Sequence, residues 1–140
     1  MRELPDNNAE EARRWLRNVE DDLRAMSALQ ADATTPGRIV CFLAHLAIEK
    51  ALKATLIDAS VPFRKTHDLV LLYAMCVEAG RLSGIDSGLL ASLNPWAIDG
   101  RYADDLVDAD RESATRFASF AADVVAAVRS ELGEVPGGGQ

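Results

Sequence analysis

The chain has 140 residues, of which 49% are hydrophobic and 26% charged, and its formal net charge is −7. This length and composition are typical of one globular domain, and no apolar run approaches the ~20 residues that a membrane-spanning helix needs. The acidic balance argues against a broad DNA- or RNA-binding surface, which needs clustered lysine and arginine, but does not exclude a local basic row. The N-terminal residues do not resemble a signal peptide, so we expect a cytoplasmic protein.

Two long amphipathic helices are predicted in the first half of the chain. Residues 8–11, Asn-Ala-Glu-Glu, have the pattern of a capping box, and apolar residues then recur every three or four positions. This pattern predicts a helix from about Ala9 to Ala31. Thr35 offers a cap and Pro36 a first helical residue for a second helix, which continues without a breaker from Gly37 to about Ala59.

Two shorter elements and a third long helix are predicted in the second half. Thr66 is a candidate cap for a helix with Asp68 in its first turn and Gly80 at its end. A short helix is predicted near Ser87 to Leu93, within an irregular region interrupted by the sequence NPW. The last helix is predicted from about Asp108 to Leu132.

The chain shows no alternation typical of strands. We therefore predict an all-α fold, an antiparallel helical bundle of about five helices, three long and two shorter. Residues 8–132 are expected to form this domain and residues 133–140 a disordered tail. Cys41 and Cys76 lie in apolar helical stretches without the short spacing of a zinc or redox pair, which predicts buried free thiols.

A row of polar residues interrupts the apolar surface of the second predicted helix. His45, Glu49 and Lys53 stand at successive i, i+4 positions, so Glu49 and Lys53 can form a helix-stabilising ion pair. A metal site would have to combine His45 and Glu49 with His67 and Asp68. We do not favour that interpretation, because Lys53 is a poor neighbour for a cation, and we predict no cofactor.

Nucleophilic catalysis is not predicted either. Cys41 is expected to be a buried free thiol, which behaves as a small hydrophobic side chain rather than as a nucleophile.

Three separated motifs resemble those of the HEPN domain family. They are CFLAHLAIEKALKATLI at residues 41–57, THDL at residues 66–69, and GRYADD at residues 100–105 before the last helix. The resemblance extends over about Ala9 to Leu132. The sequence departs from the family pattern at positions 45 and 46, where glutamines are usual, and at Ala103, where proline is usual.

The resemblance implies a homodimer that works with a separately encoded minimal nucleotidyltransferase, as a component of a nucleotidyltransferase or toxin–antitoxin type system. It implies a component that binds a nucleotide or RNA and is non-catalytic or weakly catalytic alone. The implied ligand-binding residues are Glu49, Lys50, Lys53, His67, Asp68, Arg101 and Tyr102. The lysines and Arg101 would meet phosphate or carboxylate, oriented by Glu49, while His67 and Tyr102 would hydrogen-bond to a base or stack on it.

Two alternatives stay open. The first is a metal-independent ribonuclease, in which His45 or His67 is the general base and Arg38 or Arg101 supports the phosphate. Ribonucleases of the wider superfamily have an arginine and, after four to six further residues, a histidine near the last helix, but no histidine follows Arg101. Arg38 and His45 have six residues between them, but they lie on the second predicted helix, so we interpret their spacing as a coincidence. The second is a purely structural adaptor, whose polar row forms only an internal network.

Two structural expectations follow from the second helix. Its apolar residues cover most of its circumference, and the domain has only four other helical segments to cover them. This predicts a homodimer in which a second subunit covers the remaining apolar surface of the helix. The row formed by His45, Glu49 and Lys53 is expected to be partly buried and to face Arg101 and Tyr102.

Overall fold

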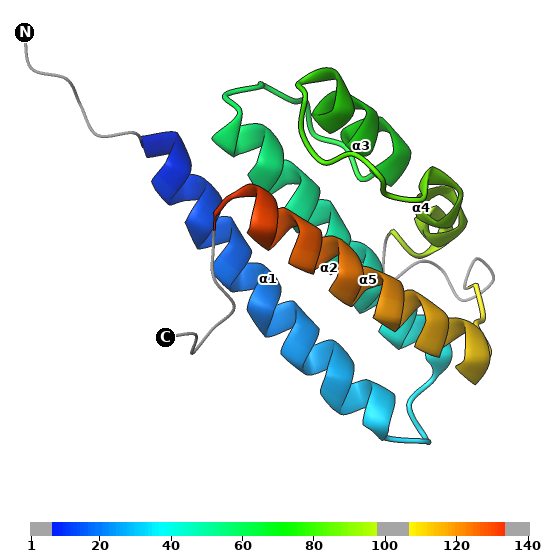
Figure 1. The fold of residues 1–140 in the computed structure, drawn as a ribbon. Coiled ribbons are helices and arrows are strands. Elements are labelled where there is room, and N and C mark those ends of the chain that lie inside the picture. Colours follow the sequence, from blue (N-terminus) through cyan, green and yellow to red (C-terminus); the bar gives the residue numbers. More distant parts are fainter. Residues whose placement is uncertain (1–6, 98–106, 134–140) are drawn as a thin grey trace, which may run out of the picture.

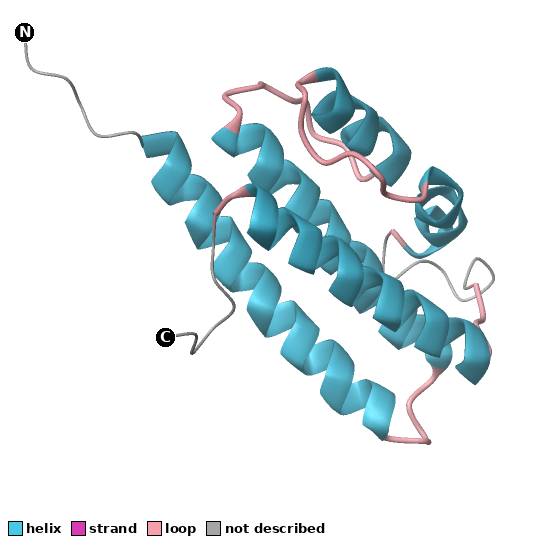
Figure 2. Ribbon diagram, viewed as in Figure 1, coloured by secondary structure: helices cyan, strands magenta, loops and turns pink. Residues whose placement is uncertain are grey.

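The computed structural model describes residues 7–97 and 107–133. These residues form five α-helices and one short 3-10 helix: α1 (Asn7–Ala31), α2 (Gly37–Asp58), α3 (Leu69–Glu78), α4 (Ser87–Leu93), η1 (Asn94–Trp96) and α5 (Arg111–Glu131). Within the same ranges there is no strand (Figure 2). The predicted all-α fold with three long and two shorter helices is confirmed. The predictions for Arg101, Tyr102 and residues 134–140 of the tail lie outside the described residues.

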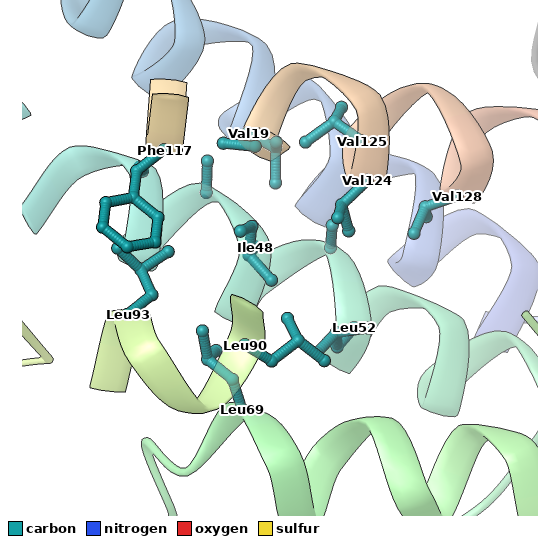
Figure 3. Close-up of a cluster of buried hydrophobic side chains, with 14 of the residues drawn as sticks. Val19, Ile48, Leu52, Leu69, Leu90, Leu93, Phe117, Val124, Val125 and Val128 are labelled. Atoms are coloured by element: carbon teal, nitrogen blue, oxygen red, sulfur yellow. The ribbon is translucent and has the colours of Figure 1, made fainter. Parts of the chain in front are cut away.

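Helix α2 is the centre of the fold. It packs against α1 and α5 on one side and against α3 and η1 on the other, and Figure 1 shows it between these two groups. Helix α1 runs antiparallel to α2, and α5 runs in the same direction as α2 (Figure 1). Buried side chains from all five α-helices meet around α2 (Figure 3), among them Val19, Ile48, Leu52, Leu69, Leu90, Leu93, Phe117, Val124, Val125 and Val128.

The chain itself covers most of the apolar surface of α2. Its buried residues extend from Val40 to Leu56 and pack against the neighbouring helices. Ile39, Phe42 and Leu46 are only partly buried, and their spacing of three and four residues places them on one face of the helix. This apolar stripe is one part of α2 that the described residues of the chain leave partly exposed.

Helix α3 begins one residue after Asp68, which is its N-cap. The carboxylate of Asp68 accepts hydrogen bonds from the backbone N–H groups of Val70 and Leu71, at 3.0 and 3.3 Å. The prediction that Thr66 caps this helix is wrong, because its hydroxyl accepts instead from the N–H of Asp68 at 3.1 Å. Thr66 therefore stabilises the turn before the helix, and Asp68 caps the helix itself.

Helix α5 also begins later than predicted. It starts at Arg111 rather than near Asp108, because the side chain of Asp110 accepts a 2.7 Å hydrogen bond from the N–H of Ser113 and so acts as the N-cap. The short helix α4 has the predicted bounds, Ser87–Leu93. The following NPW sequence, expected only to interrupt the chain, forms η1.

The two remaining predicted helix starts need smaller corrections. Asn8 lies inside α1, where its side-chain amide donates a 2.8 Å hydrogen bond to the hydroxyl of Ser60 instead of closing a capping box. Pro36 occupies the N-cap position of α2, one residue before the first helical position. Its backbone is extended, and it makes no side-chain cap.

The start of α2 lies directly against the segment that precedes α5. A Cβ atom on Gly37 would come closer than 3.0 Å to the carbonyl oxygen of Ala109, so only glycine fits there without a shift. At the opposite end of the bundle, Arg81 joins the last turns of two helices by pairing with Asp58 of α2 and Glu131 of α5. These contacts fix the two ends of α2 relative to α5.

Both cysteines are buried and free, as predicted. Burial raises the pKa of the Cys41 thiol to about 11 and that of the Cys76 thiol to about 12. Neither group is therefore a thiolate near neutral pH. None of the helices in the described part of the chain is long and apolar enough to cross a membrane.

Candidate functional site

The polar row of α2 is buried. His45 is fully inaccessible, and only 6% of Glu49 and 8% of Lys53 is exposed. Such groups need partners inside the protein, because an unpaired buried charge is costly. Their partners lie on α2 itself, in the loop before α3, and in η1.

Glu49 is the residue around which the others gather. Its Oε2 accepts a 2.9 Å hydrogen bond from the ammonium of Lys53, one turn further along α2. Both carboxylate oxygens lie 3.0 Å from Nδ1 of His67, in the loop before α3. Nδ1 of His45, one turn earlier on α2, lies 3.6 Å from Oε1. Three basic side chains thus surround one carboxylate.

The side-chain amide of Asn94 links this cluster to the start of α3. Its Oδ1 accepts from the backbone N–H of Leu69 at 3.1 Å, and its Nδ2 donates to the carboxylate of Asp68 at 3.1 Å. A backbone N–H only donates and a carboxylate only accepts, so the orientation of the amide is fixed. Oδ1 also lies 3.3 Å from Nε2 of His45. Nε2 of His45 must therefore carry a proton.

The other ring nitrogen of His45 is left without a partner. Nδ1 is buried and makes no hydrogen bond, although it faces the carboxylate of Glu49. Burial lowers the pKa of His45, an effect that the nearby Glu49 partly opposes. The contact with Asn94 selects a neutral ring protonated on Nε2, whose Nδ1 lone pair remains without a hydrogen bond.

His67 is the member of the cluster that solvent reaches. About half of its side chain, 53%, is exposed, although Nδ1 is held by Glu49. On the other side of the ion pair, the ammonium of Lys53 lies 5.8 Å from the centre of the Phe63 ring. Phe63 also lines an open groove of about 410 Å³, whose other lining residues are Asn8, Ile57, Ser60, Val61 and Pro62.

Four of the predicted ligand-binding residues are brought together. Glu49, Lys53 and His67 are in direct contact, and Asp68 joins them through Asn94. The carboxylate of Asp68 is used by the first turn of α3, which gives it a structural role.

Lys50 lies apart from this cluster. Its ammonium points to α1, where it donates to Asn18 at 2.6 Å and to Asp22 at 2.9 Å. It also lines a separate pocket of about 270 Å³ with Trp15 and other residues of α1. Arg38, at the start of α2, is partly exposed and forms no ion pair or hydrogen bond within the described ranges.

Two residues of the site were not predicted from the sequence. Asn94 was interpreted only as part of a chain break, and Phe63 only as part of a loop. Asn94 contacts residues 25 to 49 positions away, so no local pattern indicates its role. Phe63 follows Val61 and Pro62 in the loop before α3, and an aromatic residue in such a loop is the one signal that could have been followed.

The described residues contain no group of three or more His, Cys, Asp and Glu side chains placed to hold a metal ion. The cluster offers hydrogen bonding and proton transfer at His67, whose side chain is half exposed. The inner residues hold that side chain in place.

Comparison with known proteins gives one match. The model of the HEPN domain family matches residues 12–131 of the chain. No curated protein matches, and no solved structure matches.

Proposed function

The chain belongs to the HEPN domain family, and we propose that it is a homodimeric adaptor that binds a nucleotide or RNA and has little or no catalytic activity alone. Its proposed partner is a separately encoded minimal nucleotidyltransferase, in a nucleotidyltransferase or toxin–antitoxin type system. Family membership supports the partner, and the burial of His45 supports the lack of catalysis. The proposed ligand contacts are centred on His67, with Arg101 and Tyr102 as further contacts.

The burial of His45 carries this proposal. In this chain only Arg38 and His45 have the arginine–histidine spacing of the superfamily ribonucleases. A general base must come within hydrogen-bond distance of the proton that it removes from the substrate. His45 is fully inaccessible and its Nε2 is directed at Asn94, whereas Arg38 lies on the partly exposed start of α2. The pair cannot act on a common substrate without opening the core.

Incubation of the purified protein with RNAs of mixed length tests the proposal. We expect no detectable cleavage by the wild type. Cleavage that is lost in an Arg38→Ala, His45→Ala double variant would support the ribonuclease hypothesis and contradict the proposal. Because His45→Ala leaves a gap in the core, Arg38→Ala alone is included, and the fold of each variant is checked by its melting temperature.

One observation favours a second candidate, a ribonuclease that uses His67 as its base. A histidine whose Nδ1 is held by a carboxylate and whose other edge is open has the arrangement of many acid–base histidines. The same assay separates this candidate from the first. Cleavage that survives Arg38→Ala and is lost in His67→Gln would support it.

The proposed homodimer is placed on the apolar stripe of Ile39, Phe42 and Leu46. A charge introduced into a dimer contact separates the subunits, because the charge would be buried without a partner. Light scattering at micromolar concentration should give a dimer for the wild type and a monomer for Phe42→Lys. Val77→Lys is the matched control, because Val77 is an exposed apolar residue on α3. A wild-type monomer would refute the dimer.

A further inference from the structure

The contact between His67 and Glu49 determines what kind of chemical group the site can recognise. We infer that His67 accepts a hydrogen bond from a hydroxyl or amino group on the nucleoside portion of the ligand, and that phosphate is not bound at this position. The inference rests on the proposed function, because it concerns the same site.

The position of the ring proton is the first step. Both oxygens of Glu49 lie 3.0 Å from Nδ1 of His67, and an ionised carboxylate can only accept hydrogen bonds. Nδ1 must then be the donor. When the ring is neutral, the second nitrogen, Nε2, has no proton and presents a lone pair. A group that binds Nε2 must itself donate a hydrogen bond.

The ammonium of Lys53 keeps this arrangement in place. It donates to Oε2 of Glu49 at 2.9 Å, so the carboxylate receives one hydrogen bond from each side. His45 adds no third donor, because its own proton is directed at Asn94 and its Nδ1 faces Glu49 as a lone pair. Glu49 therefore acts as the acceptor for His67 and orients the ring as a positioning residue.

The charges near His67 do not favour phosphate. Lys53 is buried and its charge is balanced by Glu49, while Lys50 is turned to α1 and pairs with Asp22. Both lysines that the family pattern assigns to phosphate are thus engaged by carboxylates. Neither lysine is left free to balance the charge of a phosphate at Nε2.

The loop cations do not change this conclusion. Arg64 and Lys65 precede His67 by three and two residues, and both are exposed. Charges held in water interact weakly and are screened by salt. They can attract a phosphate to the loop, but they do not form an enclosed position for one beside His67.

A nucleoside meets the remaining requirements. Its ribose hydroxyls and exocyclic amino groups are neutral donors suited to a lone pair on Nε2. The loop that carries His67 also contains Phe63, which borders the groove of about 410 Å³. Phe63, Val61 and Pro62 give that groove apolar walls on which a base can pack.

The tautomer of His67 can be measured without any ligand. The chain has two histidines, so long-range ¹H–¹⁵N spectra of protein labelled on histidine contain only two ring systems. At pH 8 we expect His67 to be protonated on Nδ1 and His45 on Nε2, and the His67→Gln variant assigns the signals. A His67 ring protonated on Nε2 would overturn the inference directly.

Titration with adenosine and with inorganic phosphate then tests the ligand. Adenosine should shift the Nε2 signal of His67, and phosphate at the same concentration should not. His67→Gln should weaken adenosine binding about tenfold, as expected for the loss of one hydrogen bond. Lys65→Gln, a change of an exposed side chain two residues away, should leave adenosine binding unchanged.

The possible failures are distinguishable. A shift of Nε2 with phosphate but not with adenosine would overturn the inference and leave the proposed function standing. The same holds if adenosine triphosphate shifts backbone signals without moving His67. If adenosine, phosphate, adenosine triphosphate and a short RNA all leave every signal unchanged, the proposed binding function fails together with the inference.

Discussion

Glu49 and Lys53 form a 2.9 Å ion pair one turn apart on the central helix, and both side chains are buried. A buried pair of this kind depends on both partners, since either charge alone would have to be taken out of water without compensation. The pair therefore holds the site together more strongly than an exposed pair with the same spacing, which contributes only a few tenths of a kcal/mol.

Removal of the carboxylate should destabilise the fold substantially. Glu49→Ala leaves the ammonium of Lys53 buried without a counter-charge and removes the partner of His67, which should cost about 3 kcal/mol. Chemical denaturation measures this cost, and Glu78→Ala, at an exposed glutamate on α3, is the control. A Glu49→Ala protein that melts within about two degrees of wild type would show that the row behaves as a solvated face.

Gly37→Ala should disrupt the contact between the start of α2 and the segment before α5. The added Cβ would overlap the carbonyl oxygen of Ala109, which is a backbone atom and cannot swing aside. We expect a loss of about 1–3 kcal/mol in the free energy of unfolding, as for other overpacked positions. Gly88→Ala is the matched control, because its Cβ would meet only the side chain of Asp86, at 3.1 Å. Equal stability of the two variants would contradict the close approach.

Stability should fall as the pH drops below about 6.5, and His45 should account for part of the fall. Burial lowers the pKa of His45 from its usual value of 6.5. The unfolded chain then takes up a proton at a pH where the folded chain does not, which favours unfolding. The stability that neutral His45 contributes is fully present above pH 6.5 and is lost as the pH falls toward the lowered pKa of the folded protein.

Urea denaturation between pH 8 and pH 5.5 measures this dependence. His45→Gln removes the titrating group, so its unfolding free energy should change less over this range than that of wild type. Most carboxylates titrate lower, near pH 4, and contribute little in this window. Parallel curves for the two proteins would show that His45 has the same pKa folded and unfolded.

Neither cysteine should react in the folded protein. Burial raises the pKa of both thiols, to about 11 for Cys41 and about 12 for Cys76, and only the thiolate reacts readily with a disulfide reagent. At pH 8 we expect no fast thiol reaction from native protein and two equivalents after denaturation, since the chain has two cysteines. Rapid reaction of one thiol in the native protein would place that cysteine at the surface.

The helices were largely predictable because their signals are local. The apolar periodicity around α2 and the breakers on either side of α4 lie within a few residues of the elements that they define. Errors arose where several short polar residues compete to cap one helix. Thr66 and Asp68 both offer a side-chain oxygen, as do Asp108 and Asp110, and only the final turn geometry selects one of each pair.

The candidate site was only partly predictable. The i, i+4 spacing brings Glu49 and Lys53 together on one helix face, and the THDL motif pointed to His67. Lys50 was grouped with them although it lies about 100° further around the helix. Its partners Asn18 and Asp22 stand one turn apart on α1. This spacing allows both to reach one side chain of a neighbouring helix, but the sequence does not indicate which helix that is.

The single amide of Asn94 has a consequence for how the domain opens. It binds Leu69 at the start of α3, Asp68 before it, and His45 on α2, while its own backbone begins η1 directly after α4. Release of α3 alone would break the two contacts of Asn94 with Asp68 and Leu69, whereas release of α3 together with α4 and η1 breaks only its contact with His45. Helices α3 and α4 should therefore exchange their amide hydrogens as one cooperative unit, released together from the three long helices.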